Sequence, residues 1–204
     1  MTESSVRRSR GCLALLTAVG LAVAGPAVAG PADPWVIDAA ASKLGFETRQ
    51  MGVPVKGAFG KFGGTIVLDP ANLAAAKIDI IIEVASGATG TKDIDEAMTG
   101  PELLAAKKFS TARFVADKVT AEAEGKYRAE GKLTIRDASK DLALPFTLAI
   151  ADDPARPGQL KATARGRVEI KRLDYGVGQG DWKATDTVPN EVAVILELVA
   201  SRAK

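Results

Sequence analysis

The stretch Lys126–Ile135 reads KYRAEGKLTI, with apolar side chains at Tyr127, Ala129, Leu133 and Ile135 and mostly charged side chains between them. This alternation is typical of a β-strand with one apolar and one solvated face. The pattern recurs three times before residue 199, on the apolar sets Leu142, Leu144, Phe146, Leu148 and Ile150; Leu160, Ala162, Ala164, Val168 and Ile170; and Val192, Val194, Leu196 and Leu198. Such strands predict an antiparallel sheet that folds over its own apolar face.

The N-terminal half continues this pattern, with a bend in it. Segments 35–38, 42–48, 77–84 and 111–117 also alternate, and glycines at 57, 60, 63 and 64 interleave with Phe59 and Phe62. The glycines indicate a curved or bulged strand. Thr99–Glu102 resembles a helix start, so we expect one short helix that ends near Lys107–Lys108. Eight or nine strands with strong coiling favour a closed barrel over a sandwich in this all-β domain.

The first 29 residues form a separate segment. Arg7, Arg8 and Arg10 precede an uncharged run, which ends in the small-residue triplet AVA at 27–29. The apolar run is too short to span a bilayer, so this is the pattern of a cleavable secretory signal. We therefore expect an exported protein with one domain over residues 30–204. The paired arginines leave open whether export uses the general or the twin-arginine route.

Composition disfavours several classes of function. Removal of residues 1–29 leaves equal numbers of basic and acidic residues, so no basic face argues for nucleic acid. The chain has no histidine, which removes the usual general base, the commonest metal ligand and every imidazole triad. The carboxylates Asp93, Asp95 and Glu96 lack the glycine and distal glutamate of a calcium loop. The glycine cluster at 176–180 is interpreted as a hairpin. We expect no catalytic residue, no metal site and no cofactor.

The apolar residues of the inward face are the candidate ligand-binding set. A small barrel lined by Leu, Ile, Val and Phe either fills its own interior or accepts an apolar guest. Small inward residues, among them Ala129, Gly131, Ala162, Ala164 and Gly166, leave volume unfilled and favour a guest. Tyr127 and Trp182 also offer a polar edge to a head group. The predicted ligand-binding residues are Phe46, Phe62, Ile82, Phe114, Tyr127, Leu133, Leu144, Phe146 and Trp182.

Four segments, taken in order, resemble the YceI-like family of bacterial lipid-binding proteins. They are WVID at 35–38 with SKLGF at 42–46, VKGAF at 55–59 with FGGTI at 62–66, GKLTIRDASK at 131–140, and DW at 181–182 with residues 185–192. The resemblance implies an extended eight-stranded antiparallel β-barrel of lipocalin-like shape. It also implies that the interior binds a long isoprenoid, such as a polyprenyl quinone or polyprenyl phosphate, usually in the periplasm.

The chain departs from that family pattern ahead of the short helix. Ile94 and Ala97 stand where family members commonly carry arginine and histidine, although Asp95 is retained. If those polar residues contact a ligand head group elsewhere in the family, this protein does so differently. The head group of the ligand is therefore left open.

Three functions remain to be distinguished. The first is a soluble exported carrier that transports or stores an isoprenoid lipid. The second is a packed barrel that acts through its surface, as an envelope stress or interaction module. The third is an enzyme that acts on an isoprenoid head group through Asp93 and Asp95, which the missing histidine disfavours. The residues leave open a transient membrane contact and pairing with a second copy of the chain.

Overall fold

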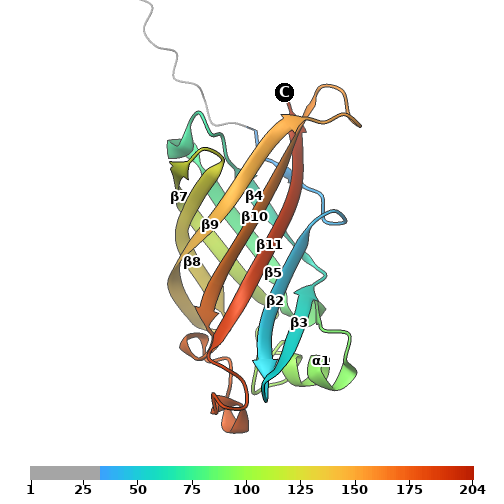
Figure 1. Ribbon diagram of the computed structural model, residues 1–204, viewed down its shortest axis with the longest axis vertical. Helices are drawn as coiled ribbons and strands as arrows, with labels where there is room; N and C mark the ends of the chain where they lie inside the picture. The colour runs from blue at the N-terminus through green and yellow to red at the C-terminus, as the bar shows by residue number, and fades with distance from the viewer. Residues whose placement is uncertain (1–32) are drawn as a thin grey trace, which may run out of the picture. The chain divides into compact units, whose positions relative to one another are not determined.

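The computed structural model describes residues 33–204, and the predicted signal peptide, residues 1–29, lies outside the described part. In this part an antiparallel sheet of eleven strands has the order β4-β5-β7-β8-β9-β10-β11-β2-β3-β6, with β1 paired to β11 (Figure 1). The all-β antiparallel class is confirmed. The strand number exceeds the predicted eight because β1 (Val36–Ile37) and β6 (Gly87–Ala88) are two-residue strands and the glycine-rich segment contributes two strands.

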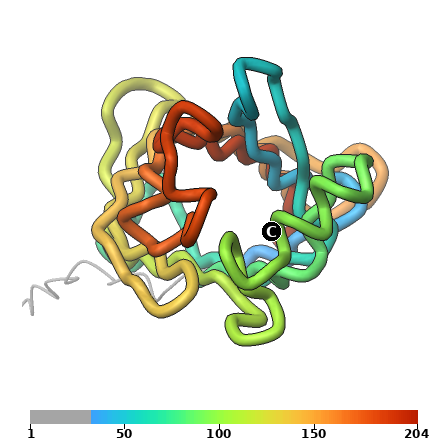
Figure 2. Tube along the Cα trace, turned by 90° about the horizontal axis from the view of Figure 1, so that it is seen from below, coloured from blue at the N-terminus to red at the C-terminus, as the bar shows by residue number. Residues whose placement is uncertain are grey.

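The longer strands wind around a common axis, as the view along that axis shows (Figure 2). Inward apolar sets of neighbouring strands meet in register, so that Val194 on β11 lies opposite Phe46 on β2. Alternation therefore gives a continuous apolar inner face. These strands are β2 (Lys43–Gln50), β3 (Val53–Phe59), β4 (Phe62–Val67), β5 (Lys77–Glu83), β7 (Thr111–Ala123), β8 (Lys126–Ile135), β9 (Ala138–Asp152), β10 (Gln159–Lys171) and β11 (Glu191–Ala203).

Strand β5 shows the predicted alternation, and β7 shows it with an interruption. On β5, Ile80 and Ile82 are buried while Ile81 is 44% exposed. On β7, the register with β8 shifts between Ala116 and Lys118. This β-bulge, which we did not predict, turns the inward face from even to odd positions.

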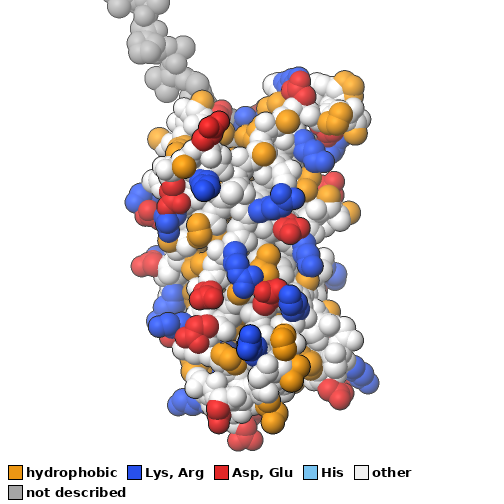
Figure 3. Space-filling model, viewed as in Figure 1, with side chains coloured by type: hydrophobic (Ala, Val, Ile, Leu, Met, Phe, Trp, Pro, Cys, Tyr) orange, Lys and Arg blue, Asp and Glu red, His pale blue; other side chains and the backbone are white. Residues whose placement is uncertain are grey.

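The outer face of the sheet is solvated and carries both signs of charge. Lysines and arginines are interspersed with aspartates and glutamates over the face seen in Figure 3. Cross-strand ion pairs contribute to this pattern, including Lys132 Nζ with Asp141 Oδ1 at 2.6 Å and Lys118 Nζ with Glu130 Oε2 at 2.6 Å. Exposed pairs of this kind add little stability, so the sheet is held mainly by its ladders and its inner face.

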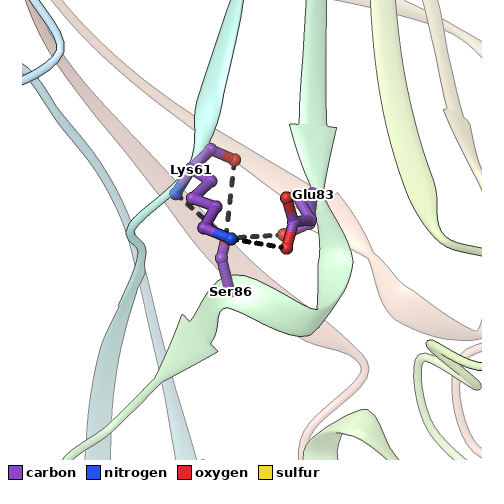
Figure 4. A network of polar contacts seen from close by, with 3 residues as sticks. All are labelled: Lys61, Glu83 and Ser86. Carbon is purple, nitrogen blue, oxygen red and sulfur yellow. Dashed lines mark hydrogen bonds and ion pairs between the residues drawn. The ribbon is translucent and has the colours of Figure 1, made fainter.

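The glycine-rich segment is two strands and not the single curved strand that we predicted. Strand β3 pairs with β2 and β6, whereas β4 pairs with β5. A small network of polar contacts holds the connection between β3 and β4 (Figure 4). Ser86 Oγ donates to the Glu83 carbonyl at 2.6 Å, the Lys61 backbone N donates to Ser86 Oγ at 3.0 Å, and Lys61 Nζ contacts Glu83 Oε1 at 3.2 Å. This network therefore links β4 and β6, the first and last strands in the order of the sheet.

At the opposite end of the strands, the segment around Trp35 spans from β4 to β11. The backbone N of Trp35 donates to the Ile66 carbonyl at 2.7 Å, and β1 pairs with β11. The indole is buried and its Nε1 donates to the Leu68 carbonyl at 2.8 Å. The Arg202 guanidinium stacks over the indole at 4.6 Å. Packing therefore closes this end of the sheet.

The helix lies earlier in the chain than predicted. Helix α1 covers Lys92–Thr99, and residues 101–108 form turns. Gly100 adopts an extended conformation and its backbone N donates to the Ala97 carbonyl at 3.1 Å, which ends α1. The backbone N of Leu104 then donates to the Met98 carbonyl and folds the turns back onto α1. No helix among residues 33–204 combines the length and apolar character needed to cross a membrane.

Four short 3₁₀ helices complete the described part of the chain: η1 (Leu73–Ala75), η2 (Val84–Ser86), η3 (Arg172–Tyr175) and η4 (Gly180–Lys183). The last two lie in the connection 172–190, which joins the antiparallel neighbours β10 and β11, so the predicted hairpin is present and its connection carries two 3₁₀ helices. Gly176, Gly178 and Gly180 all have positive φ angles. These residues provide tight turns between η3 and η4.

Candidate functional site

The sheet encloses a cavity of about 300 Å³. Small-molecule sites have volumes of about 300–1,000 Å³, so this cavity is large enough to hold a ligand. Its lining comes from the inward positions of the long strands and from segments at both ends of the sheet. The lining side chains are apolar, with the exceptions of Gly45, Thr48 and Arg172.

Side chains fill the interior only in part. Leu142, Leu144 and Leu148 line the cavity from β9 and yet keep part of their surface accessible. Their partners across the sheet are small: Ala129 lies opposite Leu144, and Ala164 lies opposite Leu148. Apolar atoms that face a void lack dispersion contacts, which an apolar guest would supply. The fully packed barrel expected by the surface-module alternative is therefore wrong.

Most of the predicted ligand-binding residues are brought together here. They come from β2, β4, β5, β7, β8 and β9, and alternation alone was the signal that identified them. Phe46 also packs against Phe59, with ring centroids 5.7 Å apart. The predicted residues that line the cavity are Phe46, Phe62, Ile82, Phe114, Leu133, Leu144 and Phe146.

Tyr127 and Trp182 lie elsewhere. The Tyr127 ring stacks on Phe146 with centroids 5.7 Å apart, at a shallow hollow between β8, β9, β10 and β11. Trp182 is half-buried in η4 and does not line the cavity. The prediction that these two residues present a polar edge to a head group has no support in this geometry.

Arg172, at the start of η3, is a cavity residue that sequence reasoning missed. It is the only charged residue of the described part that lines the cavity, and it is 3% exposed. Its Nε donates to the Pro189 carbonyl at 3.0 Å, its Nη1 to Val177 at 2.9 Å and its Nη2 to Val188 at 2.7 Å. The sequence carried a signal for this position. Val168 and Ile170 face inward at even positions of β10, and residue 172 is the next even position.

Arg172 is buried without an acidic partner among the described residues. Burial lowers the pKa of its guanidinium, and no carboxylate among residues 33–204 offsets that effect. A buried charge is ordinarily paired, because removing it from water is unfavourable. The cavity therefore contains a cation whose protein partners are neutral carbonyl groups.

Thr48 is the second polar residue of the lining. It continues the inward face of β2, and its Oγ1 is buried without a hydrogen-bond partner. Thr48 directly follows the last β2 residue that pairs with β11, and Arg172 directly follows β10. Since β10, β11 and β2 are neighbours, both polar groups lie at the same end of the sheet.

Two loops meet at this end. The Glu102 carbonyl accepts hydrogen bonds from the backbone N of Gly178 at 3.0 Å and of Gln179 at 2.8 Å. Figure 2 shows both loops, in green and red, at the end of the strands nearest the viewer. Gly178 passes close to the buried guanidinium, and a Cβ at this position would lie 1.9 Å from Arg172 Nη1. The glycine cluster thus packs around Arg172.

The carboxylates of the enzymatic alternative lie outside the cavity. Asp93 is exposed on α1. Asp95 Oδ1 accepts hydrogen bonds from Thr89 Oγ1 at 2.7 Å and from the Thr89 backbone N at 2.6 Å. These bonds lower the pKa of Asp95, the hydroxyl contributing most. Asp95 therefore joins α1 to the preceding turn and does not face the cavity.

Known proteins share both the sequence pattern and the fold. A UPF0312 protein of Vibrio cholerae is 29% identical over 167 residues, which cover 79% of this chain and 87% of that protein. The crystal structure of BcnA from Burkholderia cenocepacia matches with a TM-score of 0.72 and 34% identity, over 80% of this chain and 99% of BcnA.

A polyisoprenoid binding domain from Saccharophagus degradans matches with a TM-score of 0.61, over 83% of this chain and 98% of that domain. At 15% identity, this similarity concerns the fold. The YceI-like domain family matches residues 35–200, nearly all of the described part. The chain belongs to the YceI-like family.

Proposed function

We propose that this protein binds one long-chain polyisoprenoid lipid, with the tail inside the barrel, and transports or stores it. The observation that carries the proposal is the cavity of about 300 Å³ with an almost wholly apolar lining. The fold shared with a polyisoprenoid binding domain supports the class of ligand. A binding role also agrees with the position of Asp93 and Asp95 outside the cavity.

Burial of the tail is sufficient to drive binding. A tail of four isoprene units gains on the order of 16 kcal/mol when it leaves water, at about 0.8 kcal/mol for each CH₂ group. Association costs about 4–15 kcal/mol. Micromolar affinity corresponds to about −8 kcal/mol, so a tail of this length reaches it without any polar contact when association costs about 8 kcal/mol or less.

The site of action that we propose is the periplasm. The arginine-led apolar run and the AVA triplet of residues 1–29 support export. Transient membrane contact and a homodimer stay predictions. Met51 and Val53, which are 77% and 64% exposed at the β2–β3 turn, are the first residues at which to test membrane contact.

Two adjacent residues of β5 provide a matched test. Ile82 faces the cavity, whereas Ile81 faces solvent. We expect Ile82→Glu to abolish uptake of a quinone with a four-unit isoprenoid tail, because a carboxylate in the cavity is desolvated by the tail. Ile81→Glu serves as the control and should bind as the wild type does. Uptake is measured by organic extraction of the gel-filtered protein, and circular dichroism verifies folding. Wild-type uptake by a folded Ile82→Glu variant would contradict the proposal.

A further inference from the structure

We infer that the end of the cavity at Arg172 receives an anionic head group, the phosphate of a polyprenyl phosphate, in preference to a neutral quinone or alcohol. The inference rests on the proposed function, because it assigns the head group of the lipid whose tail occupies the same cavity. It is carried by two polar groups at one end of an otherwise apolar lining, Arg172 and Thr48.

The charge of Arg172 favours an anionic head group. The Arg172 guanidinium is buried, lines the cavity and has no carboxylate partner among residues 33–204. An isolated buried cation is unfavourable, and an anion beside it restores the balance. A neutral quinone ring would leave the charge uncompensated. A phosphate oxygen also forms a strong charge-assisted hydrogen bond with a guanidinium N–H.

Loop carbonyls fix the orientation of the Arg172 guanidinium. Nε donates to the Pro189 carbonyl, and one N–H of Nη1 donates to the Val177 carbonyl. Both N–H groups of Nη2 are also used, one by the Val188 carbonyl and the other by the Ala184 carbonyl at 3.4 Å. A guanidinium has five N–H donors, so one N–H on Nη1 has no acceptor among the described residues. The loop carbonyls hold the group in place, and we assign the remaining donor to a ligand oxygen.

The buried hydroxyl of Thr48 also favours a polar group at this end of the cavity. Its Oγ1 has no hydrogen-bond partner, and an unsatisfied buried polar atom is unfavourable. Thr48 lies on β2 and Arg172 follows β10, at the same end of the cavity. A phosphate oxygen at this end would accept from the hydroxyl, whereas an isoprenoid tail would leave it unsatisfied.

The contacts of Arg172 with loop carbonyls also give it a structural role, and the test must separate the two roles. We would measure the affinity of the wild-type protein for geranylgeranyl phosphate, for geranylgeraniol and for inorganic phosphate. The two lipids share one tail and differ only in the head group. The account predicts at least about tenfold tighter binding of geranylgeranyl phosphate than of geranylgeraniol, and no saturable binding of inorganic phosphate at the same concentrations.

Variants then locate the effect. Arg172→Gln should reduce the preference for phosphate over alcohol to within about twofold while geranylgeraniol still binds. Arg165→Gln, at an exposed position of β10, is the matched control and should keep the preference. Thr48→Val is a milder change that leaves the loops intact and should weaken only the phosphate ligand, so the test does not depend on the folding of Arg172→Gln.

The outcomes are distinguishable. Equal wild-type affinity for geranylgeranyl phosphate and geranylgeraniol would overturn the inference and leave the proposed function standing. If inorganic phosphate saturated the site at the same concentrations as geranylgeranyl phosphate, the site would bind free phosphate, and the assignment of a lipid head group would be overturned. Failure of both lipids to bind would overturn the proposed function itself. An unchanged preference in a folded Arg172→Gln variant would reduce Arg172 to its structural role.

Discussion

Trp35 Nε1 donates a hydrogen bond of 2.8 Å to the carbonyl of Leu68, across the gap that β1 spans between β4 and β11. Both residues are buried, so the bond is shielded from water. Together with the pairing of β1, it closes one end of the barrel. The other end is formed by loops, among which lie Arg172 and the Glu102 contacts with Gly178 and Gln179.

Replacement of Trp35 tests this closure. Trp35→Phe keeps an aromatic ring but leaves the buried Leu68 carbonyl without its donor. We expect a loss of about 1–3 kcal/mol in the free energy of unfolding, measured by urea titration. Trp182→Phe is the natural control, since Trp182 is half-buried and makes no such bond, and it should change stability by about 0.5 kcal/mol or less. Equal effects of the two substitutions would contradict the role of Trp35.

Gly131 tests the close approach of β8 and β7 at the bulge. A Cβ at this position would lie 2.1 Å from the Val115 carbonyl oxygen, which is backbone and has no room to move. Gly131→Ala should therefore destabilise the fold by about 3 kcal/mol. Gly63 has open space around its Cβ position, so Gly63→Ala should be tolerated. Thermal unfolding of the two variants gives the comparison, and a Gly131→Ala protein as stable as the wild type would refute this register of β7 and β8.

Asp95 gives the fold a dependence on pH. Its pKa is lowered in the folded state by the Thr89 hydrogen bonds, so its contribution to stability is present above the unfolded pKa, near 4, and is lost as pH falls through the lower folded value. Asp95→Asn should be less stable than the wild type at pH 7, and the difference should shrink below about pH 4. Urea unfolding of both proteins between pH 7 and pH 2.5 measures this. A difference that stays constant across that range would count against the assignment.

Cavity volume should set the length of the tail. Ala164 lines the cavity, and Ala149 is exposed on the neighbouring strand β9. Ala164→Trp places a ring in the void, so we expect it to weaken binding of an eight-unit isoprenoid more than of a four-unit one. Ala149→Trp should bind both as the wild type does. The ratio of the two Kd values is the readout, and an unchanged ratio in Ala164→Trp would mean that the tail lies elsewhere.

Alternation predicted the inner face because an apolar side chain recurs at every second residue of each strand, and these side chains all point to the same side. Phe46, Phe114 and Phe146 lie far apart in the chain, yet the register of antiparallel neighbours brings them to one cavity. The bulge at Asp117 was missed although the sequence carries a signal, because the apolar residues change from even positions up to Ala116 to odd positions from Val119. Its effect, the burial of Val119 at an odd position, depends on the partner strand.

The helix and the polar end of the cavity were missed for different reasons. Good helix formers after Pro101 suggested a helix there, but the contacts of Leu104 with Met98 and the break at Gly100 prevailed over local propensity. Arg172 was overlooked because a charged residue after an apolar strand is ordinarily solvated. Only the fold shows that loop carbonyls of Val177 and Val188 surround it.

Native mass spectrometry of the protein, purified without detergent from cells that naturally make it, tests the central claim most directly. We predict a complex of one protein with one isoprenoid lipid, identified by organic extraction of the same sample. A folded protein that carries no lipid, and that also fails to take up an added polyprenyl quinone and an added polyprenyl phosphate, would contradict the account.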